Sequence, residues 1–545
     1  MAGFVGRPRA GGAGTRSARG AGTAAPQGGA DAAARPAGAA TARAGVPSGP
    51  PEAPWGVTAA YRGSYRGLGD CGRWAPLCRG HGACGAGRGR VGATAWGGGK
   101  GVGAAAWGGG ARPVASATAV AGAAAEAPKT KPKRPRLPAL DALRFFLISY
   151  ICIGHFVAMA TKDVFFLRLF SQVNVAVGAF FVISGYVMAY TATELGKLEA
   201  SPRVFPAAAY TVSRIAGFFP VYFAAQLLFA PVFIYADVFY NGWVKTAWHA
   251  LATTSLSQAW FPMHAELWNP PTWFLSALAW ALVAVPYMLP YIAEMSNRGL
   301  RRCLATLTAV SVLSKVAYSY DLGCWALFEG MTRAHPNLAL FNSLRFSPFF
   351  ALVEILMGVV AARLVMVGDS GRDPEESALE ARITRWASSV PPLAIALCME
   401  SLFFARAAGL VQVNDMLIRG CVFIPLFTWF LMRIHRVTID PEAPKFSLVK
   451  LLEWAPLQYL GKISFCIYIV HGPIGQIFYK RVIANKIFGF VWSKYPPFFY
   501  VYLALVLVTA AAMQYWVAEN RWVAQRTKAA VTRINGWLLP SNLAS

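Results

Sequence analysis

Charged side chains are scarce in this sequence. Asp, Glu, Lys and Arg make up 14% of its 545 residues, whereas a soluble domain carries about 25%. Hydrophobic residues make up 56%, and the mean hydropathy is +0.42. These values exclude an ordinary soluble protein.

Several functional patterns are missing as well. The nine cysteines are odd in number and contain no Cys-x-x-Cys pair, so we expect no metal site and no disulfide framework. Gly-x-Ser-x-Gly, His-Glu-x-x-His and P-loop motifs are absent. The net charge of +26 comes largely from an Arg-rich N-terminal part and from residues beside apolar runs. No basic helix interleaved with aromatic residues appears, so we expect no nucleic-acid partner.

Long apolar runs dominate the chain after residue 137. Each is long enough to cross about 30 Å of hydrocarbon as a helix. We therefore predict an all-α, multi-pass integral membrane protein whose partner is the lipid bilayer, with about ten transmembrane helices. The predicted spans cover residues 138–160, 172–192, 213–236, 272–293, 302–320, 345–366, 390–407, 416–434, 457–479 and 498–518.

The predicted organisation has four parts. Residues 1–128 are low-complexity Ala, Gly, Arg and Pro, which predicts a disordered tail or a transit peptide. Residues 129–136 form a basic segment, 137–525 the transmembrane domain, and 526–545 a C-terminal tail. Lys and Arg gather in the loops that the ten spans put on the inner side, which predicts two cytoplasmic termini. Nothing in the sequence names the membrane.

One connection on the predicted outer side is unusual. Residues 237–271 are rich in Trp and end in Asn-Pro-Pro. Aromatic residues favour the headgroup level of a bilayer. We expect this segment either to lie along the membrane surface or to dip back into the membrane.

The first span, LDALRFFLISYICIGHF, contains three ionisable side chains. Arg144 and His155 are 11 residues apart, which puts them on nearly the same helix face about 16 Å apart. Asp141 lies one turn before Arg144 and close to that face. Asp141 and Arg144 either form a structural pair near the inner interface or belong to a functional face with His155. His155 is too deep for its ring to reach the interface.

Three further polar residues fall inside predicted spans. His471 follows GKISFCIYIV, and its position fits either a functional role or a backbone-bonded histidine near the span's mouth. Glu354 is the only acid of its span and must be paired or protonated. Ser184 precedes Gly185, a residue that permits close helix packing. Together these residues indicate a membrane cavity suited to an anionic group and to proton transfer.

The order of six motifs resembles the membrane-bound acyltransferase 3 family, which O-acylates carbohydrates, lipids and small molecules. The resemblance covers about residues 137–525. Its motifs are LDALRFFLISYICIGHF, VAVGAFFVISGYVM, SRIAGFFPVY, NPPTWFLSAL, FFALVEILMGVVAARL and LQYLGKISFCIYIVHGPI.

The resemblance implies transfer of an acyl group, commonly acetyl from acetyl-CoA, onto a hydroxyl. Acyl-CoA would be a co-substrate and no cofactor would be bound. His155 would be the catalytic base, with Arg144 holding the donor or orienting the site beside Asp141. Arg214 would meet the CoA phosphates. The residues assigned to substrate or donor binding are Arg214, Ser184, Ser276, Glu354, Ser464 and His471.

Two positions depart from the family pattern. Gly217 stands where many members have a second Arg, and Leu278 stands where many have a Glu. If that acid is needed, either Glu266 or Glu354 replaces it, or this branch works differently.

Two other functions stay open on the residues alone. A transporter or channel could use Asp141, Arg144, His155 and Glu354 as an ion or proton path. A catalytically inactive scaffold or receptor is the remaining possibility, because of the two departures.

Overall fold

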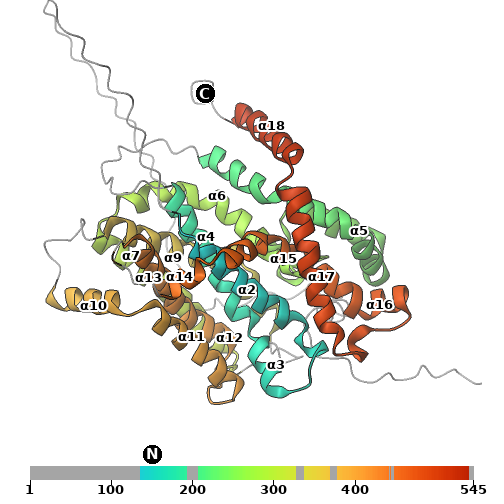
Figure 1. The fold of residues 1–545 in the computed structure, drawn as a ribbon, viewed down its shortest axis with the longest axis horizontal. Coiled ribbons are helices and arrows are strands. Elements are labelled where there is room, and N and C mark those ends of the chain that lie inside the picture. Colours follow the sequence, from blue (N-terminus) through green and yellow to red (C-terminus); the bar gives the residue numbers. More distant parts are fainter. Residues whose placement is uncertain are drawn as a thin grey trace, which may run out of the picture. The chain divides into compact units, whose positions relative to one another are not determined.

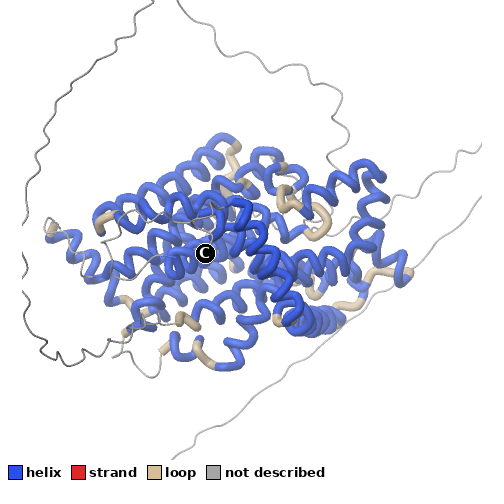
Figure 2. The backbone as a smooth tube through the Cα atoms, turned by 90° about the horizontal axis from the view of Figure 1, so that it is seen from above, coloured by secondary structure: helices blue, strands red, loops and turns tan. Residues whose placement is uncertain are grey.

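The computed structural model describes residues 136–192, 207–326, 337–368, 377–440, 442 and 447–538. Within these ranges all regular structure is helical (Figure 2), which confirms the predicted all-α class. The predicted N-terminal tail, and the basic segment as far as residue 135, lie outside the described residues.

Figure 1 shows the helices of the described ranges. They are α2 (Ala139–Phe156), α3 (Val164–Ser171), α4 (Val173–Ala192), α5 (Ala207–Thr254), α6 (Trp273–Glu294), α7 (Asn297–Asp321), α8 (Leu338–Phe346), α9 (Pro348–Val367), α10 (Ala378–Ser389), α11 (Pro392–Ala407), α12 (Asp415–Leu417), α13 (Ile424–Ile439), α14 (Leu448–Leu452), α15 (Ala455–Tyr479), α16 (Arg481–Phe488), α17 (Phe498–Met513) and α18 (Arg521–Leu538). A π-helical turn, Ile418–Phe423, joins α12 to α13.

Eight helical stretches in the described ranges are long and apolar enough to cross a membrane, or nine if the bent pair α10 and α11 forms one span. This finding supports a multi-pass membrane protein but does not confirm the predicted count of about ten. Helix α15 occupies the predicted span 457–479, yet its apolar content falls short because it contains Lys462, His471 and Gln476. The predicted span 390–407 corresponds to α11. Helix α10 precedes α11 directly, and the angle between the two helices is 83°.

Helices α4 and α9 pack at a close crossing in the core. A Cβ atom on Gly185 would lie 1.8 Å from the Ile355 carbonyl oxygen, and one on Gly358 would lie 2.0 Å from the Val182 carbonyl oxygen. Only glycine allows this approach at both positions. The close-packing interpretation of Gly185 is therefore confirmed.

Helix α15 packs along α2, and the two lie side by side (Figure 1). A Cβ on Gly461 would come within 2.4 Å of the Asp141 carbonyl oxygen, and one on Gly475 within 2.1 Å of the Phe156 ring. Early residues of one helix meet early residues of the other, so the two helices run in the same direction. This packing brings the last turn of α2 against the second half of α15.

The Trp-rich segment, residues 237–271, begins within α5 and turns back along the first part of that helix. The turn is at Gly242, where φ is +76°, a value that favours glycine. Beyond the break, the Thr253 carbonyl accepts a 2.6 Å hydrogen bond from the Tyr222 hydroxyl, far back in the same helix. The Leu256 carbonyl accepts one from Ser276 at 2.7 Å. The segment therefore folds back against α5 and α6.

Candidate active site

Two histidines meet where α2 packs on α15. His155 lies in the last turn of α2, nearer that helix's end than a mid-span position, and His471 is fully buried in α15. Their Nδ1 and Nε2 atoms, respectively, are 3.0 Å apart, and the two rings are parallel within 2°. The structure thus brings together two predicted site residues that are 316 positions apart in the chain.

The hydrogen bonds fix which nitrogens carry protons. Nδ1 of His471 lies 2.8 Å from the Tyr468 carbonyl oxygen and 3.2 Å from that of Ile467. Carbonyl oxygens only accept, so Nδ1 of His471 carries its proton, and the Nε2 of the neutral ring accepts. Nδ1 of His155 must then donate to it. Nε2 of His155 is left with a lone pair and makes no hydrogen bond to the described residues.

A tight turn, residues 269–271, contacts α15 beside the histidine pair. Asn269 donates to the Ile469 carbonyl at 2.8 Å, and the Tyr468 hydroxyl donates to the Pro271 carbonyl at 2.6 Å. A Cβ on Gly472 would lie 2.7 Å from the Asn269 side-chain oxygen. The absence of a side chain at Gly472 therefore lets the turn approach the residue next to His471.

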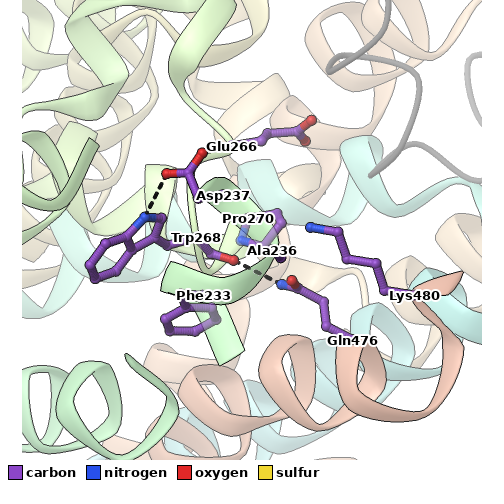
Figure 3. A pocket seen from close by; sticks show the side chains of 8 residues that line it. All are labelled: Phe233, Ala236, Asp237, Glu266, Trp268, Pro270, Gln476 and Lys480. Carbon is purple, nitrogen blue, oxygen red and sulfur yellow. Dashed lines mark hydrogen bonds between the residues drawn. The ribbon is translucent and has the colours of Figure 1, made fainter. Parts of the chain in front are cut away.

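The same turn borders a pocket (Figure 3). Its lining residues are Phe233, Ala236, Asp237, Glu266, Trp268, Pro270, Gln476 and Lys480. Gln476 donates to the Trp268 carbonyl at 2.8 Å. Gln476 lies five residues after His471 on α15, and Pro270 belongs to the turn that contacts α15, so the pocket lies near the histidine pair although neither histidine lines it.

Asp237 organises one wall of this pocket. It accepts hydrogen bonds from Asn241 at 2.6 Å and from the Trp268 indole at 3.0 Å, the second of which Figure 3 shows. It also accepts from Nδ1 of His249 at 2.8 Å. The bond from the indole helps to hold that ring against Phe233, on whose ring it stacks. Burial lowers the pKa of Lys480, across the pocket, to about 8, although Asp237 opposes the shift.

Glu266 links the pocket to the histidines. Its carboxylate lies 3.4 Å from a terminal nitrogen of Arg345, and Arg345 is close enough to His155 for an electrostatic interaction. Burial raises the pKa of Glu266, although the Arg345 guanidinium opposes the shift. Of the two acids that could replace the one absent at Leu278, Glu266 is thus connected to the His155 side of the domain.

The predicted donor residues lie elsewhere. Arg144 donates to Asp141 at 2.6 Å, which confirms that these two residues form a pair. Arg214 donates to Thr191 at 2.5 Å and lies over the Tyr210 ring. Neither arginine has a described hydrogen bond or ion pair with His155.

The three predicted serines bond to backbone carbonyls. Ser184 donates to Phe180, Ser464 to Gly461, and Ser276 to Leu256, each at 2.7 Å. The Ser184 bond lies within α4 and the Ser464 bond within α15. The Ser276 bond joins the Trp-rich segment to α6. The structure brings none of these hydroxyls into hydrogen-bond contact with the histidine pair.

Glu354 is held in a buried ion pair. Arg419, on the π-helical turn, donates to both of its oxygens, at 2.9 and 2.5 Å. Arg419 also donates to Asn174 at 3.1 Å, and Lys315 lies 3.9 Å from the carboxylate. Of the two alternatives expected for Glu354, pairing and protonation, the structure shows pairing.

Replacing Arg419 with Met should lower the free energy of unfolding by about 3 kcal/mol, the low end for breaking a buried pair. The loss stays at that end because Lys315 remains near Glu354. The double variant Arg419→Met/Glu354→Gln should lose less, since the buried carboxylate that Arg419 pairs is then removed together with it. Thermal unfolding in detergent measures both, and equal losses would contradict the pairing.

Several residues of these networks were not predicted from the sequence. Lys315 and Arg419 lie inside apolar helical stretches, so the need of Glu354 for a counter-charge could have pointed to them. Arg345 is the first residue of the predicted span 345–366, where an Arg has the pattern of an ordinary flanking cation. The two departures differ in surroundings: a Cβ on Gly217 would meet open space, whereas Leu278 packs against the core.

Comparison with known proteins gives the family. Residues 137–515 match the acyltransferase 3 family model, which is described as an acyltransferase domain. The chain is also similar to the acyltransferase MdmB of Streptomyces mycarofaciens, with 23% identity over 354 residues, 62% of this chain and 79% of that protein. No solved structure matches. Since the family match covers most of the chain, including both histidines of the pair, this multi-pass membrane protein belongs to the acyltransferase 3 family and is an acyltransferase.

Proposed function

We propose that the protein is an integral-membrane O-acyltransferase. It moves an acyl group, acetyl from acetyl-CoA, onto a hydroxyl of a carbohydrate, a lipid or a small molecule. The observation that carries the proposal is the order of hydrogen bonds through His471 and His155, which leaves Nε2 of His155 as an available base.

In this mechanism His155 takes the proton of the acceptor hydroxyl as the oxygen attacks the thioester carbonyl. The imidazolium that forms still donates from Nδ1 to His471, so His471 orients the base and shares its charge. When the thioester bond breaks, the same proton passes from His155 to the CoA sulfur. His471 is fully buried, and the low water content expected beside it protects the thioester from hydrolysis.

The donor would enter from the side of Arg144 and Arg214. Guanidinium groups suit phosphates, and Arg214 is only partly buried. Gly217 leaves a single arginine in this motif, so phosphate binding relies on Arg214 and on further contacts. The pocket beside the histidines is on the other end of α15 and would admit the acceptor.

The transport alternative receives less support from these contacts. Asp141 is engaged by Arg144, and Glu354 is engaged by Arg419 on both oxygens. These are separate ion pairs rather than a continuous set of ionisable groups leading to His155.

Release of CoA tests the proposal. Purified protein in lipid is given acetyl-CoA together with a crude cell extract as the source of acceptors, and free thiol is followed. We expect release that depends on the protein and on the extract, with a labelled ester as product. No release with acetyl-CoA or with longer acyl-CoA donors would contradict the proposal.

A further inference from the structure

Arg345 is a cation within electrostatic range of His155, and the mechanism above gives it no role. It lies in the last turn of α8. Its contact with Glu266 is 3.4 Å long, beyond the usual range of an N–H···O hydrogen bond. Its Nε atom is buried and has no hydrogen-bond partner among the described residues. The guanidinium therefore keeps donors that another group can use.

Aromatic packing holds this guanidinium in place. It lies 4.7 Å from the centroid of the Phe346 ring and 5.8 Å from that of Phe341, and Phe346 is buried. Contacts of this kind favour a cation over an aromatic face. A charge fixed in advance stabilises developing charge better than one that must first reorient.

Other cations of the described chain are engaged differently. Arg419 is bound by both oxygens of Glu354, and Arg144 is paired with Asp141, about 16 Å along α2 from His155. Arg345, by contrast, lies within electrostatic range of His155.

We propose that Arg345 is a second catalytic residue, which stabilises the oxyanion formed on the thioester carbonyl. This role rests on the proposed O-acyl transfer. As His155 removes the proton, the acceptor oxygen forms a bond to the carbonyl carbon, and the carbonyl π electrons move to its oxygen. The guanidinium of Arg345 donates to that oxygen. Collapse restores the carbonyl, breaks the carbon–sulfur bond, and releases CoA with the proton from His155.

Glu266 is then a positioning residue. Its carboxylate faces Arg345 and lines the pocket that adjoins the histidines (Figure 3). Because the ion-pair distance is long, Glu266 orients the guanidinium without occupying its donors fully. In this arrangement Glu266 lines the pocket that would admit the acceptor, and Arg345, which Glu266 orients, donates to the carbonyl under attack.

The test compares steady-state acetyl transfer by variants that are monodisperse in detergent. Arg345→Met should lower kcat by about 10²–10³-fold and leave the KM for acetyl-CoA nearly unchanged. Arg345→Gln, also neutral, replaces it if the Met variant does not fold. Arg481→Met, which removes an exposed arginine on α16, is the control and should keep wild-type activity.

A double variant separates catalysis from simple charge balance. If Arg345 only neutralises Glu266, then Arg345→Met/Glu266→Gln should recover activity. We expect it to stay as slow as Arg345→Met. Recovery in the double variant, or a loss confined to the KM for acetyl-CoA, would overturn the proposed role. Absence of transfer by the wild-type protein would overturn the O-acyltransferase proposal itself, so the two failures are distinguishable.

Discussion

The variant His155→Ala is expected to lose acyl transfer, with kcat lower by roughly 10²–10⁴-fold. In the wild type, the His155 side chain supplies the only basic nitrogen that the hydrogen bonds of the histidine pair leave available. Without it the acceptor hydroxyl must lose its proton to water, which is scarce at this site. Thioester binding should persist, because Arg144 and Arg214 are unchanged.

Radiolabelled acetyl transfer by purified protein in lipid measures this loss. His264→Ala is the matched control, since His264 lies in the Trp-rich segment and contacts Trp248 and His249 rather than His155. We expect the control to retain its activity. Turnover at the wild-type rate by a well-folded His155→Ala protein would remove His155 from the mechanism.

The variant His471→Phe is expected to lower kcat by about 10²-fold, the upper end of the loss seen when the hydrogen-bond partner that orients a metal-ligating histidine is removed. Phenylalanine has a similar ring but no nitrogen to accept the proton of His155 Nδ1. His155 could then turn its proton-bearing nitrogen toward the acceptor, which destroys the base. The KM for the acyl donor should change little, because His471 acts through His155.

A partial rescue distinguishes this role from packing. In His471→Gln the side-chain oxygen can still accept from His155, whereas Phe cannot. We expect Gln to keep more activity than Phe although it resembles the ring less well. Equal activity of the two variants, or a faster Phe variant, would show that His471 only fills space.

The sequence was sufficient for the fold class and for the individual histidines. Apolar runs predicted the helices, and the spacing of Arg144 and His155 predicted a shared face. It could not predict that His155 contacts His471, because that contact depends on two glycines, Gly461 and Gly475, which let α15 approach α2. Such long-range packing has no signal in local periodicity.

The ion pairs show a second limit. The sequence identified Glu354 as an acid in need of a partner but not that Arg419, on a π-helical turn 65 residues away, would provide it. Arg345 has no distinctive sequence pattern. Its proposed role depends on its proximity to His155 on α2, which the sequence does not show. The span count was uncertain for a related reason: α15 contains the polar residues of the site and is therefore less apolar than its neighbours.

The most direct test of the account is a double-mutant cycle between the two histidines. Rates of acetyl transfer are measured for the wild type, His155→Ala, His471→Phe and the double variant. If His471 acts only through His155, the double variant should be no slower than His155→Ala. Losses that multiply in the double variant would contradict the account, because they would mean that the two histidines contribute independently.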